Sequence, residues 1–216
     1  QSPLCQSPHL NRMMINSFRI KKALYDAHRR GVKITLILNK STRLKNNKIL
    51  SDLPWTIRRM DLGQHDAKNS KKTIYMHHKF ILVDRGYPEQ KLVTGSLNFT
   101  DLGEKYVQSF FIITTDASVI SVYGNEFDLL NKKITGITKL KQKAYHPWAA
   151  TIEYADGFLE IWMSPGFLKN SVKYRILDLI HSAQQNIDIM MWDFTDRQIA
   201  QALIKKSIEG VKVCLI

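Results

Sequence analysis

The residues best suited to chemistry lie between positions 75 and 100, in YMHHKFILVDRGYPEQKLVTGSLNFT. His77 and Lys79 are two residues apart in a segment rich in β-branched and aromatic residues, which is typical of a strand. Side chains alternate along a strand, so we expect His77 and Lys79 to share one face while His78 and Asp84 lie on the other. An imidazole and an ammonium on one face can converge on a single anion, and the spacing therefore indicates phosphate chemistry.

Cleavage of a phosphodiester needs a nucleophile and positive charge around the phosphoryl oxygens. A histidine with a pKa of about 6.5 is largely neutral at physiological pH and can serve as the nucleophile. Lys79 and the Asn98 amide can hold the phosphoryl oxygens, with Ser96 as a further donor. Because fixed cationic donors can replace a metal ion, and no cluster of carboxylates or Cys/His pairs has ligand spacing, we expect no cofactor and no metal.

Two motifs in this segment together are far more specific than either alone. They are HxKxxxxD, formed by His77, Lys79 and Asp84, and GSxNxT, formed by Gly95, Ser96, Asn98 and Thr100. In this combination and spacing the chain resembles the phospholipase D superfamily. The resemblance implies a phosphodiesterase that pairs two such motifs, in which one histidine forms a phosphohistidine intermediate and the other protonates the leaving group.

Matched position by position, the resemblance assigns a role to each motif residue. His77 corresponds to a catalytic histidine, Lys79 and Asn98 to phosphate ligands, and Ser96 to a supporting residue in substrate binding. Asp84 corresponds to the motif aspartate of the catalytic set, but its opposite strand parity indicates a structural role, such as pairing with a basic residue or fixing the turn. His78 faces away from His77, and a structural role is favoured for it as well.

One position departs from the pattern of the family. Many members carry a glutamate that orients the histidine at the place where this chain has Ser109. A serine can accept a hydrogen bond from the ring but supplies no negative charge. The departure leaves room for a catalytically weak scaffold that binds nucleic acid or an anionic membrane, as an alternative to the enzyme.

The net charge of +13 is unevenly distributed along the 216 residues. Residues 19–73 hold 15 Lys/Arg and 4 Asp, which leaves 11 of the net positive charges ahead of the HxK motif. A basic region favours a polyanionic partner, either nucleic acid or an anionic membrane surface. We expect a phospholipid headgroup as the substrate, with a nuclease acting on DNA or RNA as the alternative. No apolar run is long enough to span a bilayer, and the compartment stays open.

The rest of the chain alternates helical and strand-like segments, which is typical of an α/β fold. Apolar residues at helical spacing predict helices over residues 17–30, 117–130, 171–184 and 197–208. Apolar β-branched or aromatic runs predict strands over 32–38, 55–60, 75–84, 109–114, 158–163, 187–192 and 211–216, of which 32–38 and 109–114 are expected to be buried. The polar residues 61–72 predict a surface loop. We therefore expect a mixed β-sheet flanked by helices, as in the phospholipase D-like fold.

Two segments of the chain repeat each other at an offset of 179 residues. Residues 20–37 read IKKALYDAHRRGVKITLI and residues 199–216 read IAQALIKKSIEGVKVCLI, with eight of 18 positions identical. The repeat predicts a first, clipped phospholipase D-like repeat with its linker over 1–145, and the beginning of a second over 151–216. We expect a fragment of a two-repeat protein, whose second HxKxxxxD would fall near position 256 or come from a dimer.

Overall fold

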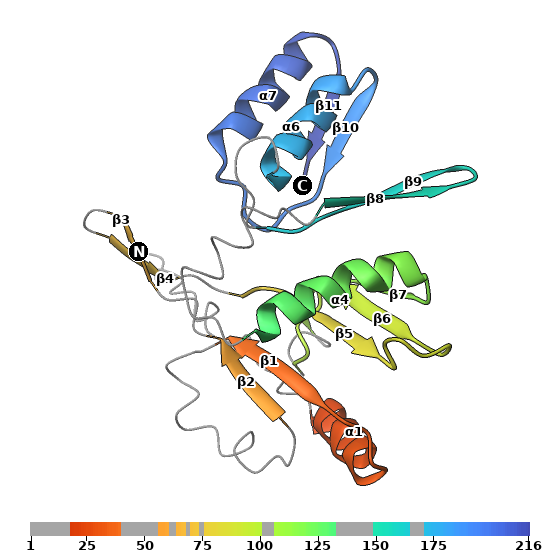
Figure 1. The fold of residues 1–216 in the computed structure, drawn as a ribbon. Helices are drawn as coiled ribbons and strands as arrows, with labels where there is room; N and C mark the ends of the chain where they lie inside the picture. The colour runs from red at the N-terminus through yellow and green to blue at the C-terminus, as the bar shows by residue number, and fades with distance from the viewer. Residues whose placement is uncertain are drawn as a thin grey trace. The chain divides into compact units, whose positions relative to one another are not determined.

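The computed structural model describes residues 18–39, 56–60, 64–67, 70–73, 76–100, 106–132, 149–164 and 171–216. The chain divides into two compact units, Gln1–Leu140 and Lys141–Ile216. Both units combine helices with parallel and antiparallel strands, so the expected α/β class is confirmed (Figure 1). The described strands form five small sheets of two or three strands in place of the single mixed sheet that was expected.

The first unit begins with helix α1 (Phe18–Arg29), which is followed by strand β1 (Thr35–Asn39). β1 pairs in parallel with β2 (Thr56–Met60). β5 (Phe80–Val83), β6 (Lys91–Gly95) and β7 (Phe111–Thr114) then form an antiparallel sheet in that order. The strand expected over 75–84 is found as the first strand of an antiparallel hairpin, although it starts only at Phe80 and leaves His77 and Lys79 ahead of the ladder.

Helix α4 (Ala117–Asn131) lies against the β5–β6–β7 sheet and contacts β5 (Figure 1). The Asp116 side chain caps the helix by accepting hydrogen bonds from the Ser118 and Val119 amides, at 2.8 and 3.0 Å. The most buried apolar side chains of this unit come from β6 and α4, namely Leu92, Val119, Ile120, Leu129 and Leu130. α4 therefore supplies most of the described core behind the motif hairpin.

Three expectations for the first unit are wrong. Residues 32–38 were expected to form a buried strand, but β1 begins at Thr35, Val32 is exposed, and residues 34–38 are only partly buried. The polar residues 61–72 were expected to form a loop, but β3 (Gln64–Ala67) and β4 (Ser70–Thr73) pair antiparallel there. A ladder of backbone hydrogen bonds does not require apolar alternation, which was the only signal considered. Residues 109–114 were expected to be buried, yet Phe110 to Ile113 are each more than half exposed, and β7 is the edge strand of its described sheet.

The second unit contains an antiparallel hairpin and an α/β segment. β8 (Ala149–Tyr154), which no sequence signal predicted, pairs with β9 (Gly157–Trp162). Helices α6 (Val172–Ser182) and α7 (Arg197–Ile208) accompany a parallel pair formed by β10 (Asn186–Ile189) and β11 (Lys212–Leu215). Ile180, Ala202 and Leu203 form the centre of this unit's core.

The two repeated segments have the same local structure. α1 and α7 each contain 12 residues, and each is followed by a glycine with positive φ, 89° at Gly31 and 93° at Gly210. The Gly31 amide donates to the His28 carbonyl at 2.8 Å, and the Gly210 amide donates to the Ser207 carbonyl at 3.1 Å. Each helix then leads into a strand with a parallel partner. This likeness agrees with a duplication, which stays a prediction.

No helix among the described residues combines the length and apolarity needed to cross a membrane. The linker predicted between the two repeats falls almost wholly outside the described residues, because residues 133–148 are not described.

Candidate active site

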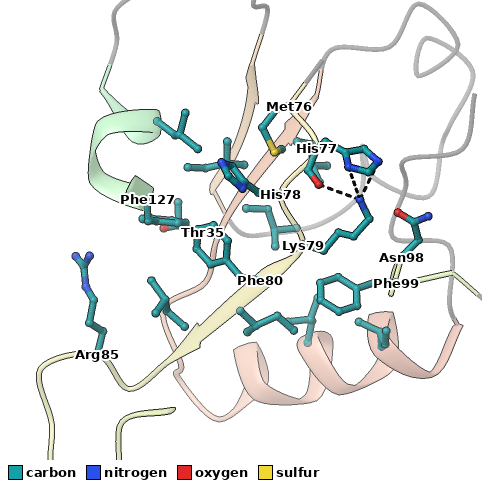
Figure 2. A pocket seen from close by; sticks show the side chains of 18 of the residues that line it. Thr35, Met76, His77, His78, Lys79, Phe80, Arg85, Asn98, Phe99 and Phe127 are labelled. Atoms are coloured by element: carbon teal, nitrogen blue, oxygen red, sulfur yellow. Dashed lines mark hydrogen bonds between the residues drawn. The ribbon is translucent and has the colours of Figure 1, made fainter. Parts of the chain in front are cut away.

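The HxK residues lie in an extended segment that leads into β5. His77 and Lys79 project to one side of it and His78 to the other, as the alternation predicted (Figure 2). The Lys79 Nζ lies 3.0 Å from the His77 Nε2, 3.2 Å from its Nδ1 and 2.9 Å from the His77 carbonyl oxygen. An ammonium donates to a ring nitrogen only if that nitrogen carries a lone pair. An ammonium and an imidazolium at this distance would repel each other, so the contact favours a neutral His77 ring.

The electrostatics of this pair favour an uncharged histidine beside a cation. Partial burial lowers the pKa of His77, and the nearby charges of Lys79 and His78 lower it further. Burial also lowers the pKa of Lys79 to about 8. Among the described residues no carboxylate forms an ion pair with Lys79. At neutral pH the site thus presents a neutral imidazole and a lysine that has become easier to deprotonate but is still mainly cationic.

A cavity of about 340 Å³ opens beside these two side chains (Figure 2). His77, Lys79 and Asn98 line it together, so the structure brings three of the five predicted site residues to one place. The remaining wall is mainly apolar and is built from α1, β1, the β5 segment and α4, with side chains that include Leu24, Leu36, Leu38, Met76, Phe99, Phe127 and Leu130. Polar and charged side chains outside the motif residues, Lys33, Thr35, His78 and Arg85, also line the cavity.

Ser96, predicted to be a phosphate donor, is not among the residues that line this cavity. Its amide donates to the Phe110 carbonyl at 3.0 Å, and its Oγ accepts a hydrogen bond from the Phe110 amide at 3.1 Å. Gly95, the preceding residue, passes so close that a Cβ there would overlap the Phe110 carbonyl. The Gly-Ser pair thus joins β6 to the start of β7.

Asp84 also lies outside the residues that line the cavity. It is exposed at the end of β5 with a φ of 48°, and its carbonyl accepts a hydrogen bond from the Tyr87 amide at 3.0 Å. Aspartate tolerates this left-handed conformation better than most residues. The geometry agrees with the structural role in the turn that strand parity indicated. It does not place the carboxylate at the cavity.

The sequence analysis missed a buried acidic residue behind the motif. Glu126 on α4 has an exposed fraction of 0 %, and its Oε1 lies 2.8 Å from the His78 Nε2. A signal was present, because Val119, Tyr123, Glu126 and Leu130 follow helical spacing on one face of α4, and a glutamate on such a face is unusual. Ser109, where the resemblance led us to look for a carboxylate, is exposed.

The described fold is of the α/β class, and it brings His77, Lys79 and Asn98 to one cavity. Comparison with known protein families matches residues 6–130, more than half of the chain, to the family described as cardiolipin synthase, PLD-like domain. The chain therefore belongs to this family within the phospholipase D superfamily, which is a superfamily of phosphodiesterases. The match covers both motifs and ends within α4. No curated protein matches the chain.

Proposed function

We propose that the protein is a phosphodiesterase of the phospholipase D type, which hydrolyses or transfers a phosphodiester through a phosphohistidine. One observation carries the proposal. The ammonium of Lys79 lies against the neutral ring of His77, and Asn98 lines the same cavity, so a nucleophile and two donors for phosphoryl oxygens surround one space.

The reaction would run in two steps. A lone pair of the neutral His77 ring attacks phosphorus, and the bond to the leaving oxygen breaks as a general acid protonates it. Lys79 and Asn98 hold the non-bridging oxygens, whose charge increases during the attack. Water, or an alcohol in a transfer reaction, then attacks the phosphohistidine and loses its proton to the same acid–base group, which releases the product and frees His77.

The general acid is proposed to be the histidine of a second HxKxxxxD motif. It would belong either to a second repeat of the same protein or to a second copy of this chain. The matching end structures of α1 and α7 support a repeat. A chain carrying the second motif would be active as a monomer, whereas the 216-residue chain would need to dimerise; gel filtration alongside the activity assay separates the two cases.

The substrate is proposed to be a phospholipid, with its phosphate at Lys79 and an apolar portion along the cavity wall. Met76, Phe99 and Leu38 are among the apolar residues that would line its path. Apolar walls with a few polar groups at one end are typical of sites for amphipathic ligands.

A nuclease is the alternative, and the uneven charge of the chain favours it. Residues 19–73 carry most of the net charge of +13. Such a charge attracts nucleic acid with a strong dependence on salt. Parallel assays on phosphatidylcholine, cardiolipin and single-stranded DNA at two salt concentrations distinguish the two substrates.

The test of the activity is turnover of bis-p-nitrophenyl phosphate, by the chain alone and by a form extended to include the second motif. We expect His77→Ala to lower the rate by a factor on the order of 10³ or more. His181→Ala, at the exposed end of α6, is the matched control and should leave the rate unchanged. A His77→Ala variant as fast as the unmodified protein, or no turnover by either form, would sink the enzyme and favour a scaffold that only binds anionic partners.

A further inference from the structure

The HxK segment lies ahead of the described β5–β6 ladder. The β5–β6 ladder begins at the pair Phe80↔Thr94, so residues 76–79 precede the first pair of the ladder. Yet His77 and Lys79 need a fixed backbone if their side chains are to meet at one phosphate, because a displacement of about 1 Å can cost 10²-fold in rate. A side-chain contact to another element can help to position this segment.

The His78–Glu126 pair supplies such a contact from the opposite side. His78 lies between the two site residues in sequence, and its ring reaches α4, 48 residues further along the chain. The Nε2–Oε1 distance is 2.8 Å, and the side chain of His78 is 26 % exposed while that of Glu126 is 0 % exposed. Burial of a carboxylate is costly unless a hydrogen-bonded partner compensates it, so loss of the His78 contact would destabilise the buried Glu126.

Aromatic packing fixes the orientation of the His78 ring as well. The ring packs edge-on against Phe80, with centroids 5.9 Å apart, and Phe80 packs edge-on against Tyr123 of α4 at 5.2 Å. The hydroxyl of Thr94 lies 3.4 Å from the Tyr123 hydroxyl and 3.5 Å from the Lys79 carbonyl, which it can reach only by a long hydrogen bond. His78 and its neighbours therefore connect the HxK backbone to one face of α4.

We propose that Glu126 is a positioning residue: through His78 it holds the backbone that presents His77 and Lys79 to the phosphate. The proposal rests on the proposed function, since it concerns the same site. Successive side chains point in opposite directions, so an anchor on residue 78 sets the direction of residues 77 and 79. Glu126 itself contacts the back of the segment and is not one of the residues that line the cavity.

The experiment uses the full chain and measures binding of inorganic phosphate through the ¹³Cε1 resonance of His77. Glu126→Leu removes the anchor and should weaken phosphate binding about tenfold or more, as the loss of an outer partner does at other sites. Glu126→Gln can still accept a hydrogen bond from the ring and should stay within about threefold of the unmodified chain, because position and not charge is the proposed contribution. In the phosphate-free protein, the chemical shift of the His77 resonance should also change, and it should change more in Glu126→Leu than in Glu126→Gln.

The double variant His78→Phe/Glu126→Leu separates positioning from general stability. It replaces the polar pair by apolar groups, and this kind of replacement often restores or raises the melting temperature. We expect it to recover the melting temperature lost in Glu126→Leu while phosphate binding stays weak. Asp128→Asn is the matched control, because it also removes a negative charge from α4 and breaks a contact to the motif hairpin, the exposed pair with Arg85.

Two outcomes would overturn the proposal. One is a double variant that binds phosphate as tightly as the unmodified chain, and the other is an Asp128→Asn variant that loses as much binding as Glu126→Leu. The bis-p-nitrophenyl phosphate assay tells this failure from that of the proposed function. If phosphate binding depends on Glu126 but no turnover is seen, the proposed enzymatic function is refuted and the positioning role is retained. If turnover survives in the double variant, the positioning role is refuted and the enzymatic function is retained.

Discussion

Lys79 should cost the protein stability at neutral pH, and replacing it by methionine should recover part of that cost. The pKa of Lys79 is lowered from 10.5 to about 8 by burial, and no carboxylate of the described residues pairs with it. A difference of this size corresponds to roughly 3 kcal/mol at about 1.4 kcal/mol per pKa unit. The side chain is only partly buried, so screening by water reduces the expected cost to about 1–2 kcal/mol.

The dependence on pH gives the prediction its sign. The folded pKa lies below the unfolded one, so between about pH 8 and 10.5 the unfolded chain binds more protons at this residue and stability rises with pH. Below about pH 8 the cost is present in full. Lys79→Met should therefore raise the free energy of unfolding by about 1–2 kcal/mol at pH 7. The advantage should disappear near pH 10.5, where the variant also lacks the hydrogen bond to the His77 carbonyl.

Urea unfolding at pH 7 and pH 10, followed by the ¹³C-methyl resonance of Met76, measures this effect. Met76 lines the same cavity and so reports on the first unit separately from the second. Phosphate binding should be lost in the same variant, which shows that the stability gain is made at the expense of the site. If Lys79→Met lowers stability equally at both pH values, Lys79 is not a buried cation in need of an anion, and the electrostatic account of the site is wrong.

Three other predictions address the same hairpin. The profile of kcat/KM against pH should be bell-shaped, rising through a pKa below 6.5 as His77 becomes neutral and falling near pH 8 as Lys79 loses its proton; a profile still rising at pH 9 would contradict these roles. Ser96→Ala should lower stability by about 1 kcal/mol in urea unfolding and change KM less than about threefold, because its Oγ serves the backbone of β7. Gly124→Ala should stabilise an Arg85→Ala variant by about 0.5–1 kcal/mol but the unmodified chain by less, since a Cβ at position 124 would lie 2.8 Å from the Arg85 Nη1. Thermal unfolding of both pairs measures the two gains, and equal gains would show that the Arg85 contact does not limit the substitution.

The part of the site that the sequence predicted is the part that local spacing determines. His77 and Lys79 share a face because they are two residues apart in an extended segment, and this alternation holds even ahead of the ladder. Asn98 reaches the same cavity because a short antiparallel hairpin returns the chain to its starting edge. Neither inference needed any knowledge of tertiary packing.

The parts that sequence reasoning missed depend on contacts between distant segments. Ser96 was assigned to the phosphate from its place in the motif, which does not tell which neighbour its hydroxyl contacts. Its Oγ accepts a hydrogen bond from the Phe110 amide, and its role at the phosphate stays a prediction. Glu126 could be noticed as a carboxylate on an apolar helix face, but its partner lies 48 residues away. The β3–β4 hairpin was missed because its residues lack the apolar alternation on which strand prediction rests.

Two electrostatic costs meet in the segment from His77 to Lys79, and they differ in what relieves them. Behind the segment, the buried Glu126 is compensated within the fold by His78. In front, the cationic form of Lys79 is disfavoured by burial, no carboxylate of the described residues pairs with it, and an anion that enters the cavity can offset this cost. A phosphate should therefore raise the pKa of Lys79 and stabilise the first unit by RT ln(1 + [L]/Kd). Because this gain requires a protonated lysine, phosphate should raise the free energy of unfolding strongly at pH 7 and progressively less above pH 8. A stabilisation by phosphate that does not decline above pH 8 would contradict the role of Lys79.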